Sequence, residues 1–95
     1  MQLVTLDEAK KRLSYESDEM DSDITLMVDG IESYLFFATG VDFSVSTNER
    51  AKKVAKEYVL TALYMQYYNV KDDTMSQARL TAMVKQLQAV GYYEA

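Results

Sequence analysis

Apolar side chains recur at helical spacing between residues 24 and 38, and this pattern constrains the fold more than any other feature of the sequence. They occupy positions 24, 27, 28, 31, 34, 35 and 38. A period near 3.6 residues places them on one face of a helix, whereas a strand would need a period of two. Gly40 follows, and glycine is typical of a helix C-terminus. We predict a helix here that buries one face and ends at Gly40.

A shorter helix is expected before it. Thr5 and Glu8 have the spacing of a capping box, in which each side chain accepts from the backbone amide of the other residue. This helix is expected to end near Ser14. The polar, acidic segment that follows is interpreted as a loop, with the N-cap of the next helix at Asp21 or Ser22.

Two more helices are predicted in the second half of the chain. After a short extended connector over residues 41–45, the sequence STNE at residues 46–49 has the pattern of a second capping box. The helix that it starts is expected to run to about Tyr68. A fourth helix is expected from near Thr74, with Gly91 as its C-terminal cap.

These elements predict an all-α fold, a small bundle of about four helices with a long central third helix. The chain contains no proline, so no residue is barred from the interior of a helix. With 95 residues it is expected to form a single domain over residues 1–95, because two parts would each lack a core.

The third helix carries apolar residues on two faces. The face expected in the core consists of Ala51, Val54, Ala55, Tyr58, Ala62 and Met65. The second face consists of Leu60, Leu63, Tyr64 and Tyr67. The second helix has an extra patch as well, with Leu26 and Phe37 opposite its main stripe.

Two interpretations account for this apolar surface. In one, the third helix is simply the central helix of its own domain. In the other, Leu26, Phe37, Leu60, Leu63, Tyr64 and Tyr67 form a subunit interface, because three other helices provide little cover and tyrosine is common where partners meet.

Charged residues are unevenly distributed. An acidic cluster includes Asp18, Glu19, Asp21 and Asp23, and a basic cluster early in the third helix consists of Arg50, Lys52, Lys53 and Lys56. Both are accounted for as solvated surfaces. Alternatively, the acidic loop of one chain pairs with the basic cluster of the next, a head-to-tail contact that builds rings or filaments.

Composition argues against an enzyme. The chain has neither cysteine nor histidine, which removes the usual zinc ligands and the commonest general base, and no cofactor or metal is expected. The formal net charge of -5 argues against an open nucleic-acid-binding face, although not against a passage for DNA. No apolar run is long enough to cross a membrane and the N-terminus lacks the pattern of a signal peptide, so synthesis in the cytoplasm is expected.

A calcium-binding loop is not expected between residues 21 and 32. Its ligand positions match Asp21, Asp23, Thr25, Asp29 and Glu32. The loop requires glycine at its sixth position, where this chain has Leu26, and the same residues interleave with the helical stripe.

Several segments together resemble the head–tail connector (adaptor) proteins of tailed bacteriophages. The resemblance is carried by residues 4–13 (VTLDEAKKRL), the acidic loop leading to residues 21–24 (DSDI), and residues 34–40 (YLFFATG). The tyrosine-rich end of the third helix and residues 83–87 (MVKQL) also resemble this family, so nearly the whole chain is covered. Many relatives have proline before the long helix, where this chain has STNE.

The resemblance implies a helical subunit without catalytic activity that forms a ring beneath the portal protein in the virion. Its implied partners are further copies of itself, the portal protein and a downstream neck, stopper or tail protein. DNA is expected to pass through the ring without sequence-specific binding. Residues 69–74 and 92–95 are expected to be mobile until a partner orders them.

A second hypothesis belongs to another class of protein. A small acidic helical regulator or inhibitor would bind one protein partner through a groove and form discrete one-to-one complexes.

Overall fold

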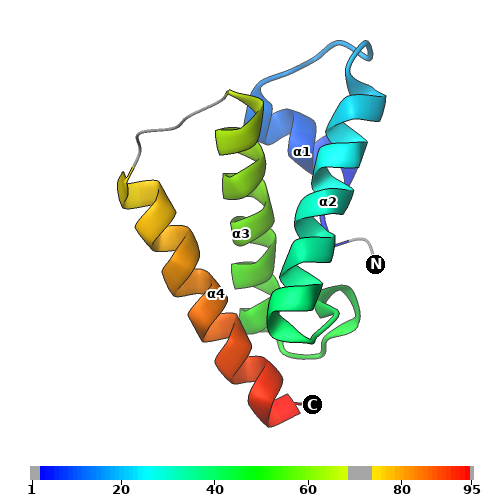
Figure 1. Ribbon diagram of the computed structural model, residues 1–95. Coiled ribbons are helices and arrows are strands. Elements are labelled where there is room, and N and C mark those ends of the chain that lie inside the picture. Colours follow the sequence, from blue (N-terminus) through cyan, green and yellow to red (C-terminus); the bar gives the residue numbers. More distant parts are fainter. Residues whose placement is uncertain (1–2, 69–73, 95) are drawn as a thin grey trace.

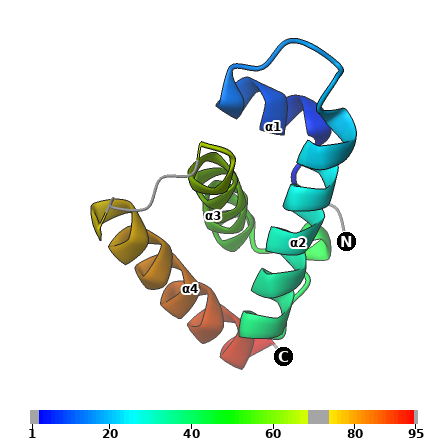
Figure 2. The ribbon, with the colours of Figure 1, turned by 45° about the horizontal axis from the view of Figure 1, so that its top comes forward.

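Four α-helices pack around a shared core in the computed structural model, which describes residues 3–68 and 74–94. They are α1 (Leu6–Leu13), α2 (Asp21–Thr39), α3 (Glu49–Tyr67) and α4 (Thr74–Glu94), with a 3₁₀ turn, η1 (Phe43–Val45), between α2 and α3. Helix α3 lies between α2 and α4 and also contacts α1 and η1 (Figures 1 and 2). The predicted all-α bundle with a long central third helix is therefore confirmed.

Helix α1 begins with the predicted capping box. The Thr5 hydroxyl accepts from the Glu8 amide at 3.2 Å, and the Glu8 carboxylate accepts from the Thr5 amide at 3.0 Å. The helix ends at Ser14, whose backbone is left-handed with φ of 55°. Both predicted ends of this helix are confirmed.

Helix α2 ends as predicted but starts differently. Gly40 has φ of 73° and its amide donates to the Phe36 carbonyl, as the pattern indicated. The N-cap is Met20 rather than Asp21 or Ser22, and no side chain caps the helix. Asp21 is instead the first helical residue, where its carboxylate is ion-paired to Lys10.

The connector before α3 is more compact than the predicted extended segment. Phe43 is buried, and the Asp42 carboxylate accepts from the Ser44 amide, which folds residues 43–45 into the 3₁₀ turn. The predicted second capping box is wrong, because the N-cap of α3 is Asn48, which accepts from the Ala51 amide. Burial of the Phe43 ring fixes the path of this connector.

Helix α4 continues through Gly91 to Glu94, so Gly91 is not the predicted C-terminal cap. A helix-interior glycine costs only about 1 kcal/mol relative to alanine. The prediction that residues 69–74 and 92–95 order on assembly falls partly outside the described residues, which omit 69–73 and 95.

One cluster of buried side chains joins every helix to the N-terminal segment. Its members include Val4, Leu13, Ile24, Val59, Leu63 and Leu87, each no more than 2% exposed. On α3 the buried residues are Ala51, Ala55, Tyr58, Val59 and Leu63. The buried face is therefore shifted from the predicted core stripe: it gains Val59 and Leu63, whereas Val54, Ala62 and Met65 are only half-buried. Helices α1, α2 and α4 all contact α3, which explains why the second face is also covered.

Helices α2 and α4 are splayed. They approach each other toward their C-terminal ends and separate toward their N-terminal ends (Figures 1 and 2). Near the close end, the Gln88 side chain donates to the Ala38 carbonyl at 2.9 Å.

Candidate interaction surfaces

The side of α2 turned away from the core carries two large apolar side chains in solvent. Leu26 is 69% exposed and Phe37 is 85% exposed. Gly30 and Ser33 lie between them at helical spacing, and we call these four residues the α2 face. A Cβ placed on Gly30 meets no atom within 4 Å. The α2 face therefore presents two large side chains separated by an open, shallow centre.

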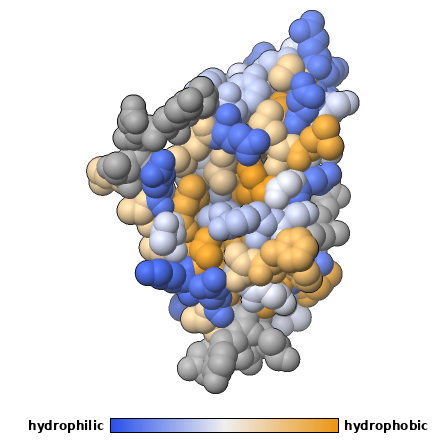
Figure 3. All heavy atoms as spheres, viewed as in Figure 1, coloured by the Kyte–Doolittle hydropathy of each residue, from blue (hydrophilic) through white to orange (hydrophobic). Residues whose placement is uncertain are grey.

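A groove runs between α2 and α4, with α3 as its floor (Figure 3). It consists of two hollows of about 320 and 250 Å³, and Tyr34 and Tyr58 line both. Leu26 and Met27 line one hollow, and Leu80 lines the other. Apolar atoms gather along the middle of this side of the molecule (Figure 3). The groove is a second candidate surface for an apolar partner.

Tyrosines at the C-terminal end of α3 pack mainly within the chain. The ring of Tyr67 lies 6.3 Å from that of Tyr15 and 4.9 Å from that of Tyr68, centroid to centroid. The Tyr68 hydroxyl donates to the Leu13 carbonyl at 2.6 Å, and the ring of Tyr64 lies 4.8 Å from that of Tyr68, tilted by 50°. These rings join the end of α3 to the end of α1.

The six predicted interface residues fall into three groups. Leu26, Phe37 and Tyr64 are exposed, Tyr64 at 45%. Leu60 and Tyr67 are half-buried and pack against the core of their own chain. Leu63 is fully buried, so its assignment to a subunit interface is corrected. Its face of α3 is covered within the same chain.

Three of the charged residues predicted to pair between chains form ion pairs within their own chain. Lys10 lies 3.0 Å from Asp18 and 2.9 Å from Asp21. The two carboxylates raise the pKa of Lys10, and Asp21 has the larger effect. Lys56 lies 3.1 Å from Glu8. Asp18, Asp21 and Lys56 therefore already have partners within the chain, and their pairing with another chain stays a prediction.

The other five charges of that prediction remain available. Glu19, Asp23, Arg50 and Lys53 are exposed, and Lys52 is half-buried. Within residues 3–68 and 75–90 none of the five forms an ion pair. The first turns of α2 and α3, which hold Asp23 and Arg50, lie at opposite ends of the molecule (Figure 1).

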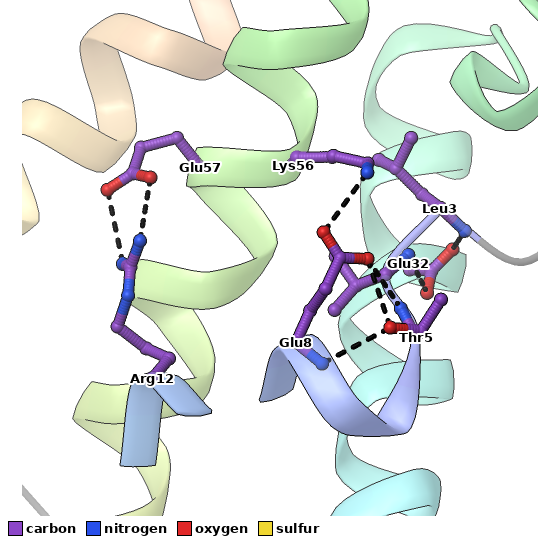
Figure 4. Close-up of polar contacts among 8 residues, drawn as sticks. Leu3, Thr5, Glu8, Arg12, Glu32, Lys56 and Glu57 are labelled. Carbon is purple, nitrogen blue, oxygen red and sulfur yellow. Dashed lines mark hydrogen bonds and ion pairs between the residues drawn. The ribbon is translucent and has the colours of Figure 1, made fainter. Parts of the chain in front are cut away.

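Two polar links between α1 and α3 have no local sequence signal. The two terminal guanidinium nitrogens of Arg12 donate hydrogen bonds to the two carboxylate oxygens of Glu57, at 3.1 and 2.8 Å. The two residues are 45 positions apart in the sequence (Figure 4). These bonds hold the pKa of Glu57 below its usual value. The amide of Thr5 and the ammonium of Lys56 lower the pKa of Glu8. Periodicity cannot pair charges on different helices, so neither link was predicted.

Glu32 is a buried carboxylate that holds the N-terminal segment. It is 4% exposed and accepts from the Leu3 amide at 2.5 Å and the Val4 amide at 3.4 Å (Figure 4). Burial raises the pKa of Glu32, and the two amides oppose that shift. In the sequence, Glu32 stands out only as a position of the calcium pattern, all five residues of which lie in α2. Its role is to satisfy two backbone donors.

Residues 3–68 and 75–90 contain no group of three or more acidic side chains arranged to hold a metal ion. None of the helices over the described ranges is both long and apolar enough to span a membrane. Comparisons with protein-family models, curated proteins and solved structures find no match to this chain.

Proposed function

We propose that this protein is a structural adaptor that assembles into a ring at the head–tail junction of a tailed phage. The ring joins the portal protein to the next neck, stopper or tail component. It leaves a channel for DNA during packaging and ejection. The subunit is made in the bacterial cytoplasm and ends up in the virion.

The observation that carries the proposal is the α2 face. Leu26 and Phe37 leave most of their apolar surface in water on a chain of only 95 residues. Burying such side chains contributes roughly 1.5–3 kcal/mol each when they are fully covered. Exposed apolar patches are typical of protein–protein contacts, and we infer such a contact for the α2 face, which has a large apolar side chain at each end.

The charge distribution also supports assembly around DNA. The formal net charge is -5, so phosphates passing through a ring of such subunits are repelled overall rather than held. Exposed carboxylates near the start of α2 and exposed cations near the start of α3 are suited to orienting neighbouring copies.

Assembly is tested by light scattering coupled to size-exclusion chromatography, and by negative-stain microscopy at increasing concentration with and without portal protein. The expected result is closed rings, either free or on the portal. A chain that stays monomeric at every concentration and does not bind portal protein would contradict the proposal.

The groove between α2 and α4 favours a second candidate, a small acidic regulator that binds one protein partner. Its two hollows are lined by tyrosine and aliphatic side chains, which suit an apolar segment of another protein. A discrete one-to-one complex with a host protein, lost on Tyr34→Asp while self-assembly is unaffected, would favour this candidate.

A further inference from the structure

The α2 face has a matching surface on the opposite side of the molecule. Helix α4 turns Met75, Ala78, Ala82 and Ala89 outward, and all four are exposed, Met75 at 83%. Their spacing places them on one side of the helix. We call these four residues the α4 edge. Apart from Met75, the α4 edge consists of alanines, whereas the α2 face has two large side chains, Leu26 and Phe37. The two surfaces therefore differ in shape.

The two surfaces also differ in charge. Helix α2 contains aspartate and glutamate but no lysine or arginine, and two of its carboxylates, Asp23 and Asp29, are exposed. Over residues 75–90 of α4 the charged residues are Arg79 and Lys85, both cationic. Lys85 is exposed, and Arg79 is 62% exposed with Glu57 at 3.9 Å. One surface is therefore acidic and the other basic.

Like charges exclude contacts between identical surfaces. Two α2 faces brought together would oppose carboxylate to carboxylate, and two α4 edges would oppose cation to cation. The favourable pairing joins the α2 face of one copy to the α4 edge of another. Large side chains then meet small ones, and acidic residues meet basic ones.

The placement of the two helices makes this contact repeatable. Helices α2 and α4 lie on opposite sides of α3 in both views (Figures 1 and 2). A copy bound at the α4 edge therefore still offers its own α4 edge to a further copy. Such head-to-tail contacts build a closed ring where the rotation between copies closes, and a filament where it does not.

We propose that the subunit contact of the ring is formed by the α2 face of one copy and the α4 edge of the next. Leu26 and Phe37 pack over the alanines, and Asp23 and Asp29 lie near Arg79 and Lys85. This inference rests on the proposed function and adds which two surfaces meet. The partner is a second copy of this chain.

Two matched variants test it. Leu26→Glu removes a large side chain from the α2 face, and Ala82→Glu places a carboxylate on the α4 edge. Both positions are exposed, so both variants are expected to fold, as checked by circular dichroism. Each is expected to weaken self-association by about tenfold or more, because an apolar contact is lost or a carboxylate is buried against acidic residues. Thr25→Glu, exposed on another side of α2, is the control and is expected to assemble normally.

Mixing the two variants gives the decisive measurement. The Leu26→Glu copy keeps an intact α4 edge and the Ala82→Glu copy keeps an intact α2 face, so an equal mixture is expected to form pairs and nothing larger. Analytical ultracentrifugation distinguishes pairs from monomers and rings. In a second measurement, Leu26→Cys and Ala82→Cys combined in one chain are expected to give a ladder of cross-linked copies on oxidation, since the chain has no cysteine of its own.

The outcomes separate this inference from the proposed function. Rings formed by wild type and by both glutamate variants would overturn the proposed contact and leave the adaptor function standing. A wild type that forms no oligomer, alone or with portal protein, together with a double-cysteine variant that gives no cross-linked ladder, would overturn both. Loss of assembly in Thr25→Glu as well would show that any added charge on α2 is disruptive, and would count against the α2 face as the specific surface.

Discussion

Glu32 links the N-terminal segment to α2 through two backbone amides. Replacing it by leucine leaves the amides of Leu3 and Val4 without their acceptor, and an unsatisfied buried donor costs about 1–3 kcal/mol. We expect Glu32→Leu to lower the free energy of unfolding by about 1–3 kcal/mol for each of the two amides that stays unsatisfied. Glu32→Gln is expected to cost less, because its amide oxygen still accepts. Urea unfolding of both variants measures the difference, and equal losses would contradict this role for the side-chain oxygens.

Glu32 also makes a specific contribution to the pH dependence of stability. Its pKa is raised in the folded protein, so the folded state holds the proton more tightly. The contribution of this raised pKa to the free energy of unfolding is fully present below pH 4.5, the ordinary pKa of a glutamate. It is lost as the pH rises through the pKa of Glu32 in the folded protein. We expect Glu32→Gln to remove this decline in unfolding free energy above pH 4.5, as measured by urea unfolding across that pH.

Glu8 and Glu57 act in the opposite direction. Their pKa values are lowered in the folded protein, so the stability that they contribute is present above 4.5 and is lost as the pH falls through the lowered values. The Glu32→Gln variant should retain this acid-side loss. A variant with wild-type pH dependence on both sides of 4.5 would show that another group is responsible for the decline.

At the scale of single elements, Gly30 and Gly40 of α2 should respond oppositely to alanine. Gly30 is inside the helix and a Cβ there meets nothing within 4 Å, so Gly30→Ala should raise the free energy of unfolding by about 0.5–1 kcal/mol. Gly40 has φ of 73°, so Gly40→Ala should lower it by about 1–2 kcal/mol. Thermal unfolding of the two variants tests this, and changes of the same sign would contradict it.

The two leucines of α3 differ in burial, so their replacement by alanine should affect stability differently. Leu63 is fully buried and Leu60 is half-buried. We expect Leu63→Ala to cost about 2–5 kcal/mol, because it loses apolar burial and leaves a cavity. Leu60→Ala should cost clearly less. Urea unfolding measures both, and a small loss for Leu63→Ala would indicate that α3 is not enclosed by its own chain.

The elements were predictable because their signals are local. The apolar period of α2, its terminal Gly40 and the Thr5–Glu8 capping box all lie within a few turns of chain. The N-caps were less predictable. Met20 caps α2 in place of Asp21 or Ser22, and Asn48 caps α3 in place of Ser46. At Asn48 the burial of Phe43 decides the path of the preceding connector, and that packing involves residues far apart in sequence.

The candidate surfaces were predictable only in part. Helical spacing places Leu26 and Phe37 opposite the buried stripe of α2, and both are exposed. The same reasoning placed Leu63 on an outer face, because spacing identifies a face but does not show what covers it. The links from Arg12 to Glu57 and from Glu32 to the N-terminal segment depend on tertiary packing, so no local pattern indicated them.

At the scale of the whole molecule, the charge difference between its two sides predicts a salt-sensitive assembly. If α2 of one copy meets α4 of the next, Lys85→Glu should weaken self-association most at low salt. The difference from wild type should shrink near 1 M salt, where charges are screened beyond about 3 Å. Sedimentation equilibrium at both salt concentrations measures this. A defect of the same size at both would mean that Lys85 acts through packing rather than charge.

The splay of α2 and α4 has a geometric consequence for such an assembly. Subunits that are broad at one end and narrow at the other do not form a straight row when they pack side by side. The row curves toward the narrow ends. The narrow end, near Gln88 and Ala38, would then point toward the inside of the curve. The taper of one subunit would thereby set the diameter of the opening.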